Sequence, residues 1–269
     1  MRSEERGFII YHLPFERSDM RRCLVLLLVF VALQLAMGGL AGLVGLGLGL
    51  TLLLTNGLVI AFMVTWERFW PTAEWRGYVR PSLWAAALAT FVVLIAEVNG
   101  LLEIVDLPDW TAGLLDEGTE ADVAFVVAAV LVGPIAEEMV FRRGMIDGLR
   151  ASRVGWARRW AVPLSAIVFG LVHFNPMQSV GALVLGLFLG WVYVRTRSLL
   201  LPIVCHVINN GLSVLLGDMR MMDVVESRYK LYVCLCVGAV VLGVALVQLG
   251  LMLHGEEEQE VRDSLGETR

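Results

Sequence analysis

The stretch GPIAEEMVFRRGMIDGLR (Gly133–Arg150) places two adjacent glutamates and two adjacent arginines after an apolar run that begins near residue 121. A transmembrane helix needs roughly 20 mostly apolar residues, so this region predicts one unusually long helix over about 121–149. A charge at the centre of a bilayer costs about 2.5–3.5 kcal/mol on insertion scales. The charged groups therefore need either a place among the lipid headgroups or a function at depth.

The rest of the chain is similarly apolar. Of its 269 residues, 58% are hydrophobic and 17% are charged, and the mean hydropathy is +0.73. This composition is typical of a polytopic membrane protein, in which an open strand is not tolerated. We therefore predict an all-α polytopic membrane protein with one transmembrane domain over 23–253. The predicted spans, about eight in number, are 23–41, 45–65, 82–101, 121–149, 160–175, 180–195, 199–217 and 231–253.

The loop charges predict the orientation of these spans. Arginines gather in alternate loops, whereas the loop at 102–120 holds six acidic residues and no Lys or Arg. Cytoplasmic loops carry the excess of basic residues, so we expect this loop outside and both termini in the cytoplasm, in a cell's inner (cytoplasmic) membrane. Residues 1–22 then form a cytoplasmic segment and 254–269 an acidic cytoplasmic tail. The first apolar run lacks a small-residue cleavage site, which favours a retained helix over a signal peptide.

Small residues predict close helix packing in two places. Glycines four apart, as at Gly38 and Gly42 or at Gly186 and Gly190, form the small-xxx-small pattern that lets membrane helices approach each other. Asn56 and Gly57 have turn character, which leaves the hairpin of the first two spans poorly defined.

Two further predicted spans carry polar groups at depth. His173 follows an apolar run that starts near residue 161, and His206, Asn209 and Asn210 lie inside the seventh span. If the fourth helix ends near Val140, its charges lie among the headgroups. If it continues to Arg150, Glu137 and His173 both lie about 20 Å from the cytoplasmic ends of their helices. Three spans with Glu, His or Asn then share one polar pocket within a core of about 121–217.

Helical spacing divides the roles of these polar groups. Glu138 and Arg142 are four apart on one face and should neutralise each other, which leaves Glu137, about 100° away, as the free carboxylate. His206 and Asn210 also share a face, and two donors on one face can stabilise an oxyanion. Asn209 points elsewhere, and we expect it to hydrogen-bond a neighbouring helix.

The sequence resembles a known family in three motifs that occur in order: EExxxR at Glu137, Glu138 and Arg142; FxxxH at Phe169 and His173; and HxxxN at His206 and Asn210. This pattern is similar to that of the CAAX prenyl protease and bacteriocin-processing (CPBP, or Abi) intramembrane proteases. The resemblance implies an all-helical core and an endopeptidase in which Glu137 and His173 activate water. It also implies that His206 and Asn210 stabilise the oxyanion.

The cofactor and the function class are open at this point. We favour catalysis without a cofactor, because carboxylate and imidazole groups can act on water directly. A zinc ion held by Glu137, His173 and His206 is the chemically reasonable alternative. A non-catalytic membrane immunity or scaffold protein and a proton-coupled transporter are alternative functions, although the halves show no duplication. The expected partners are the lipid bilayer and a membrane-associated protein or peptide substrate, with no nucleic acid.

Overall fold

A computed structural model describes residues 20–66, 79–105, 107–110, 123–218, 235, 238 and 241–252 of the chain. Within these ranges the secondary structure is helical and no strand occurs, which confirms the all-α polytopic class. Most of the segment 1–22, the acidic tail 254–269, much of the 102–120 loop and the start of the eighth predicted span lie outside the described residues. Their assignments stay predictions.

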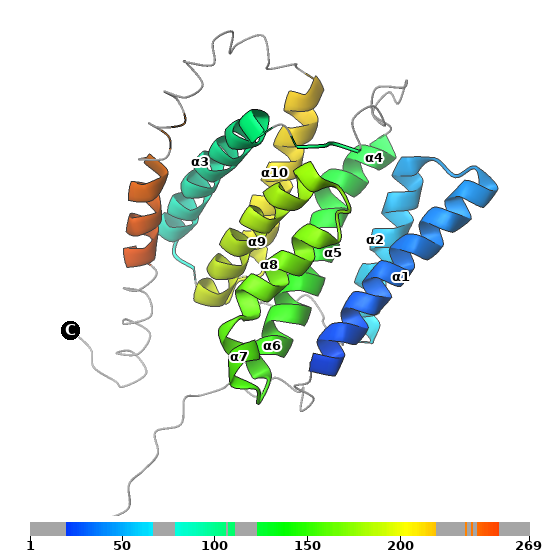
Figure 1. The fold of residues 1–269 in the computed structure, drawn as a ribbon, viewed down its shortest axis with the longest axis horizontal. Coiled ribbons are helices and arrows are strands. Elements are labelled where there is room, and N and C mark those ends of the chain that lie inside the picture. Colours follow the sequence, from blue (N-terminus) through cyan, green and yellow to red (C-terminus); the bar gives the residue numbers. More distant parts are fainter. Residues whose placement is uncertain are drawn as a thin grey trace, which may run out of the picture.

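The helices follow the predicted spans closely in the first part of the chain (Figure 1). The three N-terminal helices are α1 (Met20–Val44), α2 (Leu48–Thr65) and α3 (Pro81–Val105). The turn expected near Asn56 and Gly57 is wrong, because α2 runs through both residues without a break. The actual turn between α1 and α2 contains Gly45, whose φ of 70° lies in the left-handed region that favours glycine.

The fourth predicted span is one continuous helical path, Val123–Ala151, of 29 residues. It therefore continues well beyond Val140, and the alternative in which it ends there is wrong. Its hydrogen-bond pattern changes along the way, so that two wide π-helical segments enclose a six-residue α-helical segment. The successive pieces are α4 (Val123–Val127), η2 (Ala128–Val132), α5 (Gly133–Glu138), η3 (Met139–Ile146) and α6 (Asp147–Ala151).

The second half of the chain contains α7 (Gly155–Arg159), α8 (Ala161–Leu171), α9 (Pro176–Thr196) and α10 (Leu200–Asp218). Five helical stretches of the described chain are long and apolar enough to cross a membrane. Shorter apolar helices occupy the other three predicted spans. The full span expected at 160–175 is thus wrong in length, because the 11 residues of α8 rise only about 16 Å.

Helices α8 and α9 pack closely side by side, as the glycine spacing predicts. A Cβ on Gly186 would lie 3.0 Å from Ala166 Cα, and one on Gly190 would lie 2.9 Å from Val162 Cγ1. Gly38 and Gly42 differ, because no described atom lies within 4 Å of a Cβ built on either. Close packing within this chain is therefore found for the pair in α9 and not for the pair in α1.

Two apolar clusters flank the Val123–Ala151 path. One joins it to α1, α2 and α8, and its centre includes Phe141, whose ring lies 5.5 Å from Phe30 and 5.1 Å from Phe169. The other joins α3, α9 and α10 to Leu249. Figure 1 shows this order, with α1 and α2 on one side, α3 and the C-terminal helix at 241–252 on the other, and the central helices between them.

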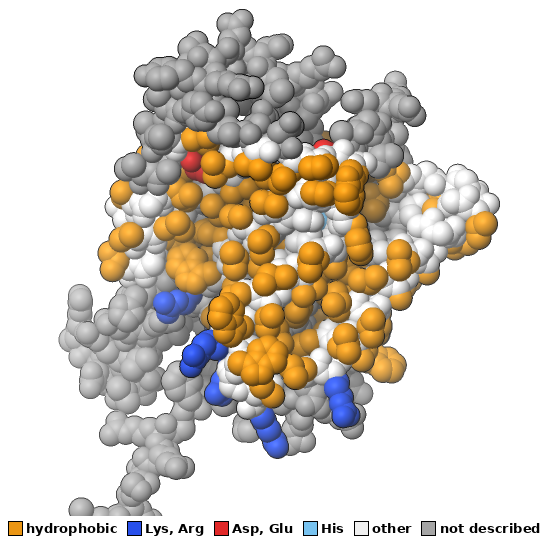
Figure 2. All heavy atoms as spheres, viewed as in Figure 1, with side chains coloured by type: hydrophobic (Ala, Val, Ile, Leu, Met, Phe, Trp, Pro, Cys, Tyr) orange, Lys and Arg blue, Asp and Glu red, His pale blue; other side chains and the backbone are white. Residues whose placement is uncertain are grey.

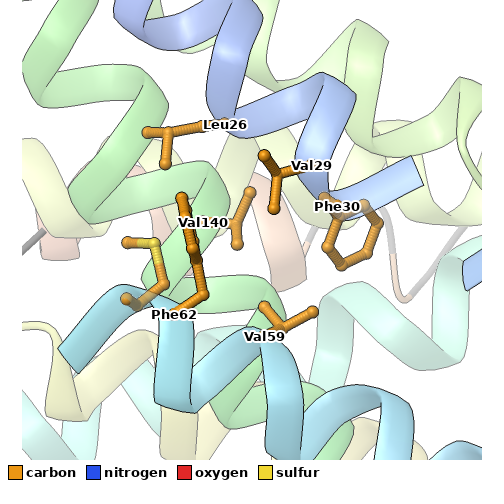
Figure 3. Close-up of a pocket in the computed structure, with 7 residues that line it drawn as sticks. Leu26, Val29, Phe30, Val59, Phe62 and Val140 are labelled. Atoms are coloured by element: carbon orange, nitrogen blue, oxygen red, sulfur yellow. The ribbon is translucent and has the colours of Figure 1, made fainter. Parts of the chain in front are cut away.

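The recess between α1, α2 and η3 is apolar throughout (Figure 3). Its lining residues are Leu26, Val29, Phe30, Val59, Phe62, Met63 and Val140. Side chains of this kind supply packing and no acid, base or ligand. The chemistry of the η3 helix must therefore lie on its other faces.

Candidate active site

The adjacent glutamates Glu137 and Glu138 end the α5 segment, between the two π-helical segments. The sequence explains part of this distortion. The N–H of Gly133 donates to the carbonyl of Ala128, five residues back, and Pro134 has no N–H to offer. The Ala129 carbonyl thus loses its usual donor four residues on and finds none five residues on. π-helical turns of this kind occur frequently at functional sites.

Glu138 is completely buried and holds two partners. Its Oε2 lies 2.9 Å from Arg142 Nε, and both side chains are 0% exposed. Its Oε1 lies 2.9 Å from His206 Nδ1 on α10. The Glu138 and Arg142 pair predicted from spacing is confirmed. A buried carboxylate with a fixed cation and a fixed imidazole is suited to holding the site together.

Glu137 has a more open environment than its neighbour. Its side chain is 21% exposed, and its Oε2 lies 3.5 Å from His206 Nε2. That distance is too long for a strong hydrogen bond. The two nitrogens of the His206 imidazole therefore face different glutamates. Nδ1 is hydrogen-bonded to Glu138, whereas Nε2 lies near Glu137, whose carboxylate is left without a strong hydrogen bond. The expectation that Glu137 lacks a partner on its own helix agrees with this geometry.

His173 lies in the turn that follows α8. Its Nδ1 is 2.7 Å from the Phe169 carbonyl. A carbonyl only accepts, so Nδ1 is the donor in this bond, and in the neutral ring Nε2 is then the acceptor. The Phe169 ring lies edge-on to His173 and His206, with centroids 5.0 and 5.7 Å apart, and the Arg142 guanidinium stands 4.9 Å over it. One aromatic ring thus separates the two histidines, and no ion pair joins His173 to a glutamate of the described chain.

Asn210 contacts the distorted helix directly. Its Nδ2 donates to the Ala129 carbonyl at 2.8 Å, and Asn209 Nδ2 donates to Asn210 Oδ1 at 3.0 Å. The interhelical hydrogen bond expected of Asn209 is therefore made by Asn210, and that interpretation was wrong. The physical reason is the carbonyl that Pro134 and the π-helical turn leave without a helical donor.

The metal alternative can be tested against the same geometry. Oxygen and nitrogen atoms of Glu137 and His206 face each other at 3.5 Å, and both groups suit zinc. His173 does not complete the set, because no group of three His, Cys, Asp or Glu side chains in the described ranges could hold a metal ion. In this arrangement the residues present do not form the expected three-ligand site.

Asn56 and the contact between Asn175 and Asp109 were missed at the sequence level. Asn175 Nδ2 donates to Asp109 Oδ1 at 2.7 Å, which ties the turn after His173 to the segment after α3. Asn56 is buried in α2 and faces Gly133 of α5. A polar side chain within an apolar span drew attention to His173 and His206, and the same signal was present at Asn56.

One comparison with known proteins covers the part of the chain that carries the three motifs. Residues 119–212 match the family described as type II CAAX prenyl endopeptidase Rce1-like. The "Putative membrane peptidase YdiL" of Bacillus subtilis (strain 168) is 27% identical over 141 residues, which cover 50% of this chain and 55% of that protein. The chain thus spans about half the length of this curated relative.

No solved structure matches the chain at a significant level. The matched region nevertheless includes all three motifs, from Glu137 to Asn210, and the helices that bring them together. Over residues 119–212, the chain is thus similar to the Rce1-like endopeptidases.

Proposed function

We propose that the chain is an intramembrane endopeptidase that hydrolyses a peptide bond in a membrane-associated protein or peptide. The observation that carries the proposal is that two adjacent glutamates have unlike environments. Glu138 is buried against Arg142, Glu137 is partly exposed, and His206 lies beside both. Neighbouring carboxylates with different surroundings are a general means of dividing roles in hydrolysis. The family match and the peptidase name of the relative support the same reaction.

In the proposed mechanism Glu137 is the general base. It takes a proton from water as the water oxygen bonds to the scissile carbonyl carbon. His173 accepts a hydrogen bond from the same water through Nε2, since its Nδ1–H is donated to Phe169. As the carbon–nitrogen bond breaks, the proton on Glu137 passes to the leaving amine. The hydroxyl of the water thus ends on the new carboxyl group and its proton on the new amine, and Glu137 returns to its carboxylate form.

The third motif stabilises the tetrahedral intermediate in this proposal. Asn210 has two amide hydrogens, one of which the Ala129 carbonyl accepts. His206 is oriented by Glu138, so that Nε2 is directed to the Glu137 side. Donors held in place before the reaction stabilise the oxyanion most effectively.

We favour a metal-independent reaction, because the carboxylate and imidazole groups in the site can move protons without further help. The substrate classes that suit the family are a prenylated C-terminal tail, a C-terminal sorting signal and a leader peptide. A binding or immunity protein, and a proton-coupled transporter, are the competing functions.

The first test compares wild type with Glu137→Gln in detergent. The probes are quenched fluorescent peptides of the three substrate classes, the first with and without a farnesyl group. Turnover should fall at least ~100-fold, because the base is lost while size is kept. Thermal unfolding should stay near that of wild type.

Glu137→Gln with full activity would refute the assignment, and the absence of cleavage by wild type would favour a binding or transport function. The same assay after EDTA treatment tests the metal question. Loss of activity that zinc restores would overturn the metal-independent mechanism.

A further inference from the structure

Asn56 is a buried polar side chain that the mechanism above does not use. It lies in the middle of α2, is 6% exposed, and its Oδ1 is buried without a hydrogen-bond partner in the described part of the chain. Two other buried polar residues of α2 behave differently. Thr51 donates its hydroxyl to the carbonyl of Gly47, which caps α2, at 2.9 Å, and Thr55 donates to the Thr51 carbonyl at 2.7 Å. Asn56 therefore differs from both threonines, because its buried side-chain oxygen has no hydrogen-bond partner in the described part of the chain.

The Asn56 side chain borders the helix that carries the proposed base. Its Nδ2 lies 3.6 Å from the position that a Cβ on Gly133 would occupy. Gly133 and Glu137 are the first and fifth residues of α5 and so lie on one face, one turn apart. A distance of 3.6 Å is ordinary van der Waals contact, so the amide packs directly against this face. The carboxamide thus lies one turn from Glu137.

A buried carboxamide oxygen without a hydrogen-bond partner destabilises the folded protein. Burial of an amide without a hydrogen bond is unfavourable, and the hydrocarbon of a bilayer supplies no donor or acceptor. Polar groups within membrane spans are accordingly associated with function. A carboxamide has an acceptor and two donors, and the backbone of an extended peptide offers one donor and one acceptor per residue. The two sets of groups are complementary.

We propose that Asn56 binds the backbone of the peptide substrate, one helical turn from Glu137. This inference rests on the proposed function for the nature of the ligand, and it adds α2 to the substrate site. Recognition through the backbone would hold the chain beside the base whatever its side chains are. It would also place the first helical hairpin, which lies outside the matched region, in contact with the substrate.

The test measures peptide binding to a variant that cannot cleave the peptide. Fluorescein-labelled forms of the probe peptides are titrated against Glu137→Gln and against Glu137→Gln with Asn56→Leu, with anisotropy as the signal. Leucine keeps the size of the side chain and removes the amide. Loss of a buried hydrogen bond should weaken binding roughly 5- to 100-fold. The melting temperature should stay equal or rise, since no internal hydrogen bond is lost.

Thr55→Val in the same background is the matched control, because Thr55 is adjacent, buried and bonded within its own helix. It should bind the peptide as the parent does. Equal affinity with and without Asn56, absence of binding to the parent, or a lower melting temperature for Asn56→Leu than for Thr55→Val would overturn the inference. Intact binding together with no Glu137-dependent cleavage by wild type would instead refute the proposed function alone.

Discussion

At the scale of single residues, Glu138 shows how burial alone changes what a carboxylate does. It has the same chemistry as Glu137 and is its neighbour in the chain, yet it is fully enclosed with Arg142 and His206. Removal of one partner of a buried ion pair leaves the other charge uncompensated, at a cost of about 3–5 kcal/mol. Glu138 should therefore affect stability before it affects chemistry.

Glu138→Gln should lower the melting temperature and the yield of folded protein, because it leaves Arg142 buried without its counter-charge. Asp147→Asn is the matched control. Asp147 pairs with Arg143 with the same spacing on the same helical path, at 2.6 Å, but these side chains are 22% and 21% exposed. Thermal unfolding in detergent should show the smaller loss for Asp147→Asn. Equal losses would contradict a structural role specific to Glu138.

The sequence predicts side-chain contacts correctly at this scale where both partners lie on one helix. The four-residue spacing of Glu138 and Arg142 was enough to predict their pair. It could not predict that His206 would bond to Glu138, because that contact joins positions 68 residues apart. Nor could it show that Asn210 and not Asn209 reaches a neighbouring helix, since this depends on a carbonyl freed by a distorted turn.

At the scale of helices, the long fourth span was predictable and its π-helical turns were not. Its length follows from apolar composition and from polar groups that match in depth, whereas a wide turn has no compositional signature beyond the missing N–H of Pro134. The shortness of α8 was also missed. Its apolar run continues into Val172, but the chain turns after Leu171, and Phe174 adopts a φ of 51°.

The contact between α10 and η2 gives the prediction at this scale. Asn210→Ala should leave the Ala129 carbonyl without a donor, at a cost of about 1–3 kcal/mol, and should lower kcat much more than it changes KM. Asn209→Ala should be milder in both respects, since its side-chain amide bonds only to Asn210 among the described residues. Unfolding and cleavage are measured on membranes with matched expression. Abolished turnover in Asn209→Ala, with turnover retained in Asn210→Ala, would refute this division.

At the scale of the whole molecule, one face of the surface is largely apolar and has basic side chains at one edge (Figure 2). Figure 2 shows hydrophobic side chains over most of one face and basic side chains at its lower edge, below the central helices. Arg153, Arg158 and Arg159 are exposed in the region between α6 and α8, and Trp156 and Trp160 beside them are 56% and 54% exposed. Arginine and tryptophan together are typical of a membrane interface on the cytoplasmic side.

The orientation can be checked with single cysteines at Arg153 and in the acidic loop at 111–120, which lies outside the described residues, in a variant without native cysteines. A membrane-impermeant maleimide on intact cells should label the loop position and should reach position 153 only after the cells are permeabilised. Normal expression of both variants is the control. Labelling of both positions from one side would contradict the predicted topology.

The π-helical turns on either side of Glu137 and Glu138 have a consequence for how this protein can change over time. Each wide turn holds about one residue more than an ordinary turn, so the helix after it keeps the phase of the helix before it. Removal of one residue from Ala128–Val132 would therefore restore an ordinary helix and leave the glutamates on the same face. Removal of one residue from the α-helical segment Gly133–Glu138 would instead rotate the two sides by about 100° relative to each other. Single-residue deletions should therefore be tolerated better in the wide turns than in the α-helical segment between them.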